Sequence, residues 1–158
     1  METKIRKPLH EDIKAIHRMM RDFAEFEKLL DWFEITENKL AGVLFGEDSF
    51  VEALLASIDG KPVGYAFFFP CFASFRGQRG LYLEDLYIAA EYRGRGVGEA
   101  MLREIARFGK SRGFERIDFQ VIDWNESAMR FYKRLGGVAM DGTRYFKFSD
   151  KAFHDLAA

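Results

Sequence analysis

The chain has 158 residues, of which 48% are hydrophobic and 31% charged, with only 3 prolines. This balance is typical of a folded protein with a substantial core, so we expect a single domain over residues 1–158 and no disordered tail. The net charge of −1 gives no general attraction to nucleic acid or to an anionic membrane, and neither is expected as a partner.

The single cysteine and the lack of long apolar runs indicate in which cellular compartment the protein is expected. Cys71 is the only cysteine, so no intramolecular disulfide can form, which favours a reducing environment. The first residues contain no apolar signal segment, and no run of about 18 apolar residues occurs that could span a membrane. We therefore expect a cytoplasmic protein.

Periodicity and turn residues predict a mixed arrangement of helices and strands. In the first half, strands are expected at Lys4–Arg6, Phe50–Ile58 and Val63–Phe69, with helices at Glu11–Leu30 and Thr36–Phe45. In the second half, the expected order is a strand from Leu81, a helix at Val97–Arg112, a strand at Glu115–Ile122, a helix at Glu126–Leu135 and a strand at Arg144–Phe148. The pattern predicts an α/β fold of the α+β type, with one central sheet flanked by helices.

The stretch Leu81–Glu99 combines a strand, a glycine-rich turn and a helix, which is how a chain offers backbone N–H groups to a phosphate. A Walker loop would need Gly-Lys followed by Ser or Thr, and none is present. A dinucleotide fingerprint would need a third glycine where Glu99 stands. The spacing that remains is R-x-x-G-x-G, at Arg93, Gly96 and Gly98, although a plain glycine helix start would look similar.

This spacing resembles the pyrophosphate loop of the GNAT superfamily of N-acetyltransferases. The blocks LYLEDLYI, EYRGRGVGEAML and DWNESAMRFYKRLGG resemble, more narrowly, the diamine (spermidine/spermine-type) N-acetyltransferases and the thialysine N-acetyltransferases. The likeness covers most of the chain, from about Phe23 to Phe148. It implies a mixed, mostly antiparallel sheet, acetyl-CoA as donor, a small-molecule primary amine as acceptor, and a homodimer.

The resemblance also implies site residues. Cofactor contacts are expected from a strand, the loop and a later helix, at Leu86, Tyr87, Ile88, Arg93, Gly94, Arg95, Gly96, Val97, Gly98, Glu99, Asn125, Glu126, Ser127, Ala128 and Tyr132. Acceptor contacts are expected at Phe26, Glu27, Glu84, Asp85 and Asp141. An oxyanion donor is implied at a backbone N–H near Ile88.

Tyr132 is the candidate general acid. Acetyl transfer from a thioester needs a proton for the departing thiolate, and a phenol beside Lys133 and Arg134 can supply one. The alternative is a Tyr that packs on an apolar helix face next to Phe131.

Glu84 is the candidate base, acting directly or through water. Strict alternation places Tyr82, Glu84, Leu86 and Ile88 on one face of the strand, and Leu83, Asp85 and Tyr87 on the other. Adjacent carboxylates in an apolar strand are costly without partners, and a cationic amine would be one. A structural pair with arginines is the alternative.

Glu27 falls on the apolar stripe of the first predicted helix, where a carboxylate needs a cation. Alternatively, Glu27 lies at an edge of the stripe that is exposed to solvent. The run Glu25–Glu37 contains Lys28 as its only positive charge, which favours a cationic acceptor, although such runs are often solvated surface.

Two departures from the family pattern affect the acceptor pocket. Phe26 stands where the family has Tyr, and Thr143 stands where it has Trp, while Asp141 keeps a carboxylate one methylene shorter than Glu. The three histidines show no metal-ligand spacing, so no metal is expected. Two other functions stay open: acetylation of a protein lysine or N-terminus, and a non-catalytic acyl-CoA-binding module.

Overall fold

The computed structural model of the protein describes residues 2–158, which form two compact units, one ending at Gln120 and one starting at Val121. The first unit contains β1 (Thr3–Arg6), a 3-10 turn (His10–Asp12), α1 (Ile13–Phe26), a 3-10 turn (Leu30–Trp32), α2 (Glu37–Phe45), β2 (Glu52–Ile58), β3 (Lys61–Ala73), β4 (Gln78–Ile88), a 3-10 turn (Ala90–Tyr92), α3 (Val97–Ser111) and β5 (Arg116–Asp118). The second contains α4 (Glu126–Arg134) and α5 (Asp150–Leu156). Among residues 2–158, every helix is too short or too polar to span a lipid bilayer.

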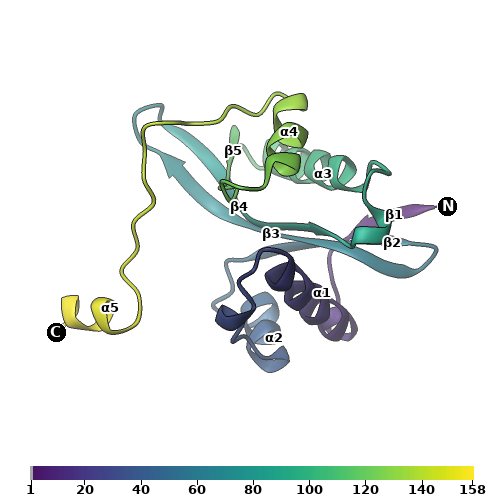
Figure 1. Ribbon diagram of the computed structural model, residues 1–158, viewed down its shortest axis with the longest axis horizontal. Helices are drawn as coiled ribbons and strands as arrows, with labels where there is room; N and C mark the ends of the chain where they lie inside the picture. Colours follow the sequence, from purple (N-terminus) through teal and green to yellow (C-terminus); the bar gives the residue numbers. More distant parts are fainter. Residues whose placement is uncertain (1) are drawn as a thin grey trace. The chain divides into compact units, whose positions relative to one another are not determined.

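The first unit is built on one five-stranded sheet in the order β1-β2-β3-β4-β5. Neighbouring strands from β1 to β4 are antiparallel, and β5 is parallel to β4. Helices α1 and α2 lie on one face and α3 lies on the other (Figure 1). The prediction of a central, mixed and mostly antiparallel sheet flanked by helices is confirmed.

Apolar side chains are buried on both faces of this sheet. On the α3 face, Met101 and Ile105 are fully buried with strand residues such as Phe68. On the opposite face, Ile16 of α1 and Leu40 of α2 are buried near β3. Each such side chain contributes about 1.5–3 kcal/mol to folding. The two clusters hold β3 and β4 as a rigid support for the segments that follow them.

A β-bulge interrupts β4 at Glu84. Phe68 lies opposite Leu83 and Phe67 lies opposite Asp85, so Glu84 has no opposite residue in the register with β3. One extra residue in a strand bends it locally and reverses the alternation of side chains beyond it.

The bulge corrects the predicted faces of β4. Strict alternation put Leu83 on the same face as Asp85 and Tyr87, and this prediction is wrong. Leu83 packs in the α3 cluster together with Leu86 and Ile88, whereas Tyr87 packs on the α1 side. Periodicity could not reveal this, because a bulge adds a residue without changing the apolar character of the strand.

Local signals in the first unit match the predicted element ends. The hydroxyl of Thr36 accepts from the backbone N–H of Lys39 at 3.1 Å and caps α2, at the predicted start of this helix. Asp59 and Gly60 form the turn between β2 and β3, both with positive φ.

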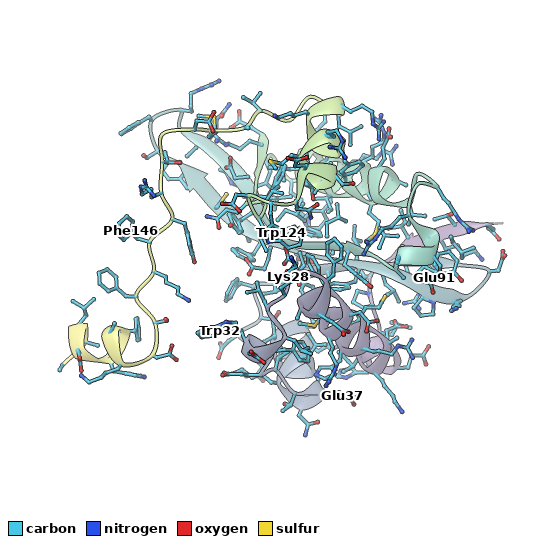
Figure 2. The ribbon with its side chains drawn as sticks, in the orientation of Figure 1. Lys28, Trp32, Glu37, Glu91, Trp124 and Phe146 are labelled. Carbon is cyan, nitrogen blue, oxygen red and sulfur yellow. The ribbon has the colours of Figure 1, made fainter. Side chains whose placement is uncertain are left out.

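The first long helix is shorter than the predicted range Glu11–Leu30. Helix α1 ends at Phe26, because Lys28 (labelled in Figure 2) takes a left-handed φ of 61° that an α-helix cannot continue through.

Two predicted strands differ in the structure. The strand expected at Glu115–Ile122 is much shorter in the structure. It is β5, three residues long, and it pairs with β4 at three positions. The prediction of a strand at Arg144–Phe148 is wrong, because residues 138–149 form no strand and are exposed. Their alternation of polar and apolar residues is that of a half-buried strand, but a strand also needs a paired edge, and the described part of the second unit offers none. Helix α5 was not predicted.

Candidate functional site

The glycine turn between β4 and α3 has the geometry of a phosphate-binding loop. Gly94 and Gly96 adopt φ values of 72° and 80°, in the left-handed region that glycine favours. A Cβ at either position would meet nothing within 4 Å, so the backbone conformation and not crowding requires glycine. Helix α3 begins at Val97, and the N–H groups of its first turn have no partner within the helix. Together with the helix dipole, these groups can bind a pyrophosphate.

Arg93 joins this turn to the ends of β4 and α1. Its Nε donates to the carbonyl oxygen of Ile88 at 2.8 Å. Its guanidinium lies over the ring of Phe26 at 4.7 Å and over the ring of Tyr87 at 5.6 Å, both within cation–π range. The structure therefore brings together four predicted site residues from three segments of the first unit.

The C-terminal half of β4 has an open edge. β5 pairs with β4 only at Gly80, Leu81 and Tyr82, and beyond Tyr82 no strand within residues 2–158 pairs with that edge. An open edge presents alternate backbone N–H and C=O groups that an extended ligand can pair with. The predicted backbone contacts, Leu86 to Ile88, lie on this half of the strand.

The carboxylate of Glu84 is exposed at the bulge. No arginine or other cation in the described chain pairs with it, so the alternative reading of Glu84 as a structural ion pair has no support in the contacts. An exposed carboxylate at a fixed bend of the backbone can accept a proton directly or through water.

Asp85 differs from its neighbour because it is enclosed. The hydroxyl of Tyr65, a fully buried residue of β3, donates to Oδ2 of Asp85 at 2.8 Å. Burial raises the pKa of Asp85 to about 6; the Tyr65 hydrogen bond lowers it, and the negative charges of Glu84 and Glu27 raise it further. Burial also raises the pKa of Tyr65 well above its usual range, so the phenol stays protonated as the donor. Sequence reasoning did not identify Tyr65.

Glu27 is half-buried at the C-cap of α1, and burial raises the pKa of its carboxyl. Its charge acts on both Asp85 and Tyr65, so these three residues form one acidic cluster. Phe26, the preceding residue, is 41% exposed and carries the Arg93 contact. We call Glu27, Tyr65 and Asp85 the acidic cluster from here on.

The second unit holds the other predicted residues. Asn125 caps α4, because its Oδ1 accepts from the N–H of Ala128 at 3.2 Å. Tyr132 is half-buried in the last turn of α4, with its ring edge-on to Phe131 at 5.0 Å between centroids. Its carbonyl accepts from the N–H of Gly137, which closes the helix. The predicted site residues thus divide into two groups, one in each unit.

The remaining predicted residues are in exposed positions of the second unit. Glu126 and Ser127 are exposed in the first turn of α4, and Asp141 is exposed in the segment 138–149. Within residues 2–158, no group of three or more His, Cys, Asp or Glu side chains is arranged to hold a metal ion.

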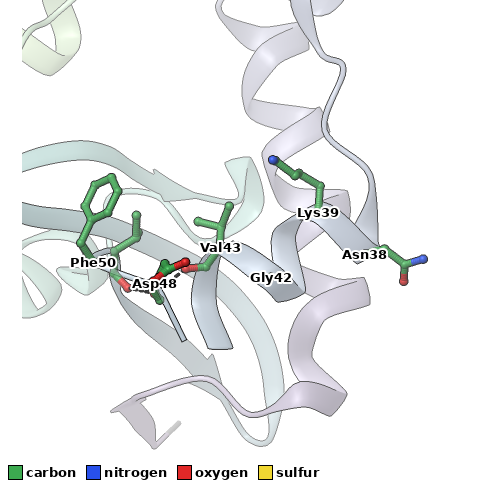
Figure 3. A pocket seen from close by; sticks show the side chains of 8 residues that line it. Asn38, Lys39, Gly42, Val43, Asp48 and Phe50 are labelled. Atoms are coloured by element: carbon green, nitrogen blue, oxygen red, sulfur yellow. Dashed lines mark hydrogen bonds between the residues drawn. The ribbon is translucent and has the colours of Figure 1, made fainter. Parts of the chain in front are cut away.

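A hollow of about 340 Å³ lies elsewhere in the first unit, between α2 and the start of β2 (Figure 3). The hydroxyl of Ser49 donates to the carbonyl of Val43 and ties the connecting loop to α2. The hollow is lined by Asn38, Lys39, Gly42, Val43, Asp48, Ser49, Phe50 and Val51. It contains none of the predicted site residues.

Comparison with known proteins assigns the chain to a family. Residues 9–137 match the acetyltransferase (GNAT) family. The chain belongs to this family. The assignment confirms the resemblance drawn from the LYLEDLYI block and the glycine turn, and with it N-acetyltransferase activity of the GNAT type. The matched range covers every predicted site residue except Asp141.

Several named relatives align with nearly the whole of this GNAT chain. It is 35% identical over 164 residues to a thialysine N-epsilon-acetyltransferase of Bos taurus, covering 97% of this chain and 96% of the relative. It is 27% identical over 201 residues to an L-ornithine N5-acetyltransferase of Arabidopsis thaliana, covering 99% and 88%. A human spermidine/spermine N(1)-acetyltransferase-like protein is 28% identical over 92% of this chain, which matches 22% of that longer protein.

Solved structures share the fold. An integron cassette protein from the mobile metagenome of V. cholerae has a TM-score of 0.82 at 22% identity, over 99% of this chain and 98% of its own. An aminoglycoside acetyltransferase from an uncultured soil metagenomic sample, in complex with sisomicin, has a TM-score of 0.77 at 17% identity, over 94% and 97%. At these identities the likeness establishes the α/β fold and nothing about the acceptor.

Proposed function

We propose that this GNAT enzyme transfers the acetyl group of acetyl-CoA to a primary amine of a small cationic acceptor, either a polyamine or diamine or a thialysine-like amino acid. The contact between the glycine turn and the end of α1 supports this most directly. Arg93 of the turn packs on Phe26, which precedes the half-buried Glu27. A turn suited to an anion and a segment suited to a cation therefore adjoin within the first unit.

The donor is assigned to the turn and to the open edge of β4. Backbone N–H groups from Gly94 to Glu99 bind the pyrophosphate, and the positive φ of the two glycines turns the backbone toward it. The edge of β4 from Leu86 to Ile88 pairs with the amide groups of the donor's extended arm. In the second unit, Asn125 to Ala128 and Tyr132 complete the donor contacts.

The reaction is a direct attack within a ternary complex. The neutral amine nitrogen attacks the thioester carbon, a C–N bond forms and the C–S bond breaks. The nitrogen gives its proton to Glu84, directly or through water, and the departing thiolate takes the phenolic proton of Tyr132. Exchange with water then restores both groups. A backbone N–H near Ile88 donates to the developing oxyanion.

The acceptor's charge is assigned to the acidic cluster, with Asp141 as a further carboxylate. No cation in the described chain pairs with Glu27 or Asp85, and a carboxylate enclosed in this way is stabilised by a positive charge. The names of the relatives support an amine acceptor, since they include thialysine, L-ornithine and spermidine/spermine.

The proposal extends to the assembly and location of the enzyme. We infer a single acetyltransferase domain over residues 1–158, because the family match runs from the first unit into the second. We infer a homodimer, because residues 138–149 expose a series of large apolar side chains. We also infer a cytoplasmic location, which the single cysteine supports.

A thiol-release assay tests the function. Purified protein and acetyl-CoA are incubated with polyamines, thialysine, ornithine, lysine-containing peptides and no amine, and free CoA thiol is measured. We expect release with one or more small amines that carry two nitrogens. Faster release with peptides would assign the enzyme to protein acetylation. Tight acetyl-CoA binding without release in any arm would make it a binding module.

A further inference from the structure

Tyr65 carries a hydroxyl at a position where packing alone would accept phenylalanine. Its side chain is fully buried in β3, beneath α1 and α2, with the rings of Phe67 at 4.8 Å and Tyr87 at 6.0 Å. A buried phenol is tolerated only with a hydrogen-bond partner, and the partner here is Oδ2 of Asp85. The core therefore contains a donor directed at one predicted site residue.

The bulge at Glu84 makes this pairing possible. In a regular strand without the bulge, residues 83 and 85 share a face, and Asp85 would lie with Leu83 on the α3 side. With it, Asp85 stands on the α1 side and meets Tyr65. Because β3 and β4 are held by core packing on both faces, the donor and the carboxylate are fixed relative to each other.

The carboxylate of Asp85 can still accept hydrogen bonds from a further partner. Tyr65 occupies one of its two oxygens, and no cation within residues 2–158 pairs with the carboxylate. The other charged group of the acidic cluster, Glu27, is also negative. An ionised carboxylate can accept several hydrogen bonds, and an ammonium group supplies up to three donors and the missing charge.

We propose that Tyr65 is a positioning residue for the acceptor: its buried hydroxyl orients the Asp85 carboxylate to receive an ammonium group of the acceptor other than the nitrogen that is acetylated. This rests on the proposed function, because it concerns the same acceptor site. Tyr65 is fully buried and so touches neither the acceptor nor the reacting atoms; it acts through Asp85.

Ionisation of the cluster provides a readout that packing would not change. Asp85 binds a cation only when ionised, and its pKa is about 6. The Tyr65 hydrogen bond lowers this pKa, while Glu84 on β4 and Glu27 after α1 raise it. Tyr87, the other titratable group beside Tyr65, acts on the phenol. Removing the hydroxyl therefore raises the pKa of Asp85, and the acidic limb of kcat/KM moves to higher pH.

The test compares Tyr65→Phe, Asp85→Asn and the double variant with the natural protein. We expect Tyr65→Phe to raise the KM for a diamine acceptor roughly tenfold, as for loss of a charge-assisted hydrogen bond, with a much smaller change in kcat. The acidic limb should move to higher pH in this variant. In Asp85→Asn the ionisation with a pKa of about 6 should be lost from the profile, while the limb due to the amine and Glu84 stays. The double variant should match Asp85→Asn, because Tyr65 acts through Asp85.

A matched control separates positioning from stability. Phe68→Leu removes part of an equally buried ring of β3 on the α3 side, away from Asp85. It should lower the melting temperature and leave the acceptor KM and the pH profile unchanged. If Tyr65→Phe behaves in the same way, or if its effect adds fully to that of Asp85→Asn, the proposal is overturned.

A second measurement does not depend on turnover. Carboxyl ¹³C NMR titration of Asp85 in the natural protein and in Tyr65→Phe should show a higher pKa in the variant, and addition of a diamine should lower the pKa in the natural protein. An unchanged pKa in both comparisons refutes the role of Tyr65. If no amine releases CoA thiol, the proposed function fails, while the titration still decides whether Tyr65 controls Asp85 and whether Asp85 binds a cation.

Discussion

Tyr132 can be tested by the removal of one oxygen atom. If its phenol protonates the departing thiolate, Tyr132→Phe should lower kcat by about 10²- to 10⁴-fold, the usual contribution of a general acid. The affinity for acetyl-CoA should change far less, because the ring stays. A thiol-release assay measures kcat, and calorimetric titration with acetyl-CoA measures the affinity.

Tyr145→Phe is the matched control for this change. Tyr145 lies in the same unit, is 72% exposed and is assigned to neither the reaction nor acetyl-CoA binding. Phenylalanine also keeps the apolar ring in the proposed dimer segment. It should keep full turnover. Equal turnover in Tyr132→Phe and the natural protein would remove Tyr132 from the mechanism and leave it as a packing residue beside Phe131.

At the scale of single residues, the sequence identified the types of group and not their surroundings. Glu84 and Asp85 were both singled out as carboxylates in an apolar strand. Their different environments, one exposed and one hydrogen-bonded to Tyr65, depend on the bulge and on the register of β3 against β4. Register is a long-range property, so Tyr65 gave no local signal: a Tyr in an apolar strand is usual.

At the scale of elements, the turn before α3 depends on the backbone of Gly96. Gly96→Ala places a Cβ at a φ of 80°, which costs about 1 kcal/mol or more of stability. It should also weaken acetyl-CoA binding, because relief of the strain turns the N–H groups of the turn away from the pyrophosphate. Urea unfolding and acetyl-CoA titration measure the two effects.

Gly60→Ala controls for the strain alone. Gly60 has the same φ of 80° and the same open surroundings, but it lies in the turn between β2 and β3. It should lose similar stability and keep the natural affinity for acetyl-CoA. A matching loss of affinity in Gly60→Ala would mean that Gly96 acts through general stability and not through the turn.

The link between β1 and α1 predicts a pH dependence of stability. Arg6 donates to both carboxylate oxygens of Asp12, at 2.7 and 3.0 Å, and the N–H of Leu9 adds a third bond. The hydrogen bonds from Arg6 lower the pKa of Asp12 below its usual range. The folded-state pKa is thus below the unfolded one, so the contribution is complete above the unfolded pKa and is lost as pH falls through the folded pKa.

Asp12→Asn should therefore lower the free energy of unfolding by about 1–3 kcal/mol at neutral pH. The difference should shrink as the solution is acidified, because the natural protein then loses the same interaction. Urea unfolding at a series of pH values gives this curve. A constant difference across pH for Asp12→Asn would contradict the linkage.

For the whole molecule, periodicity predicted the central sheet and its flanking helices because each face of that sheet buries a regular apolar pattern. It failed at Arg144–Phe148, where the alternation is that of a strand but the segment is exposed. Whether such a pattern pairs depends on which edge it meets, and that edge can belong to another copy of the chain. A single sequence contains no information on that choice.

The segment 138–149 leads to the last prediction. Phe146 (Figure 2) is 85% exposed, and Val138 and Met140 are exposed by 81% and 78%. Several large apolar side chains exposed within one short segment are typical of an interface. We expect light scattering after size exclusion to give twice the chain mass of 18.3 kDa.

Phe146→Asp should shift the protein toward the monomer, since burying an unpaired charge at an interface is costly. Phe75→Asp, which replaces a still more exposed ring between β3 and β4, should leave the mass unchanged. A monomeric natural protein, or a dimer that Phe146→Asp does not weaken, would exclude this segment as the interface.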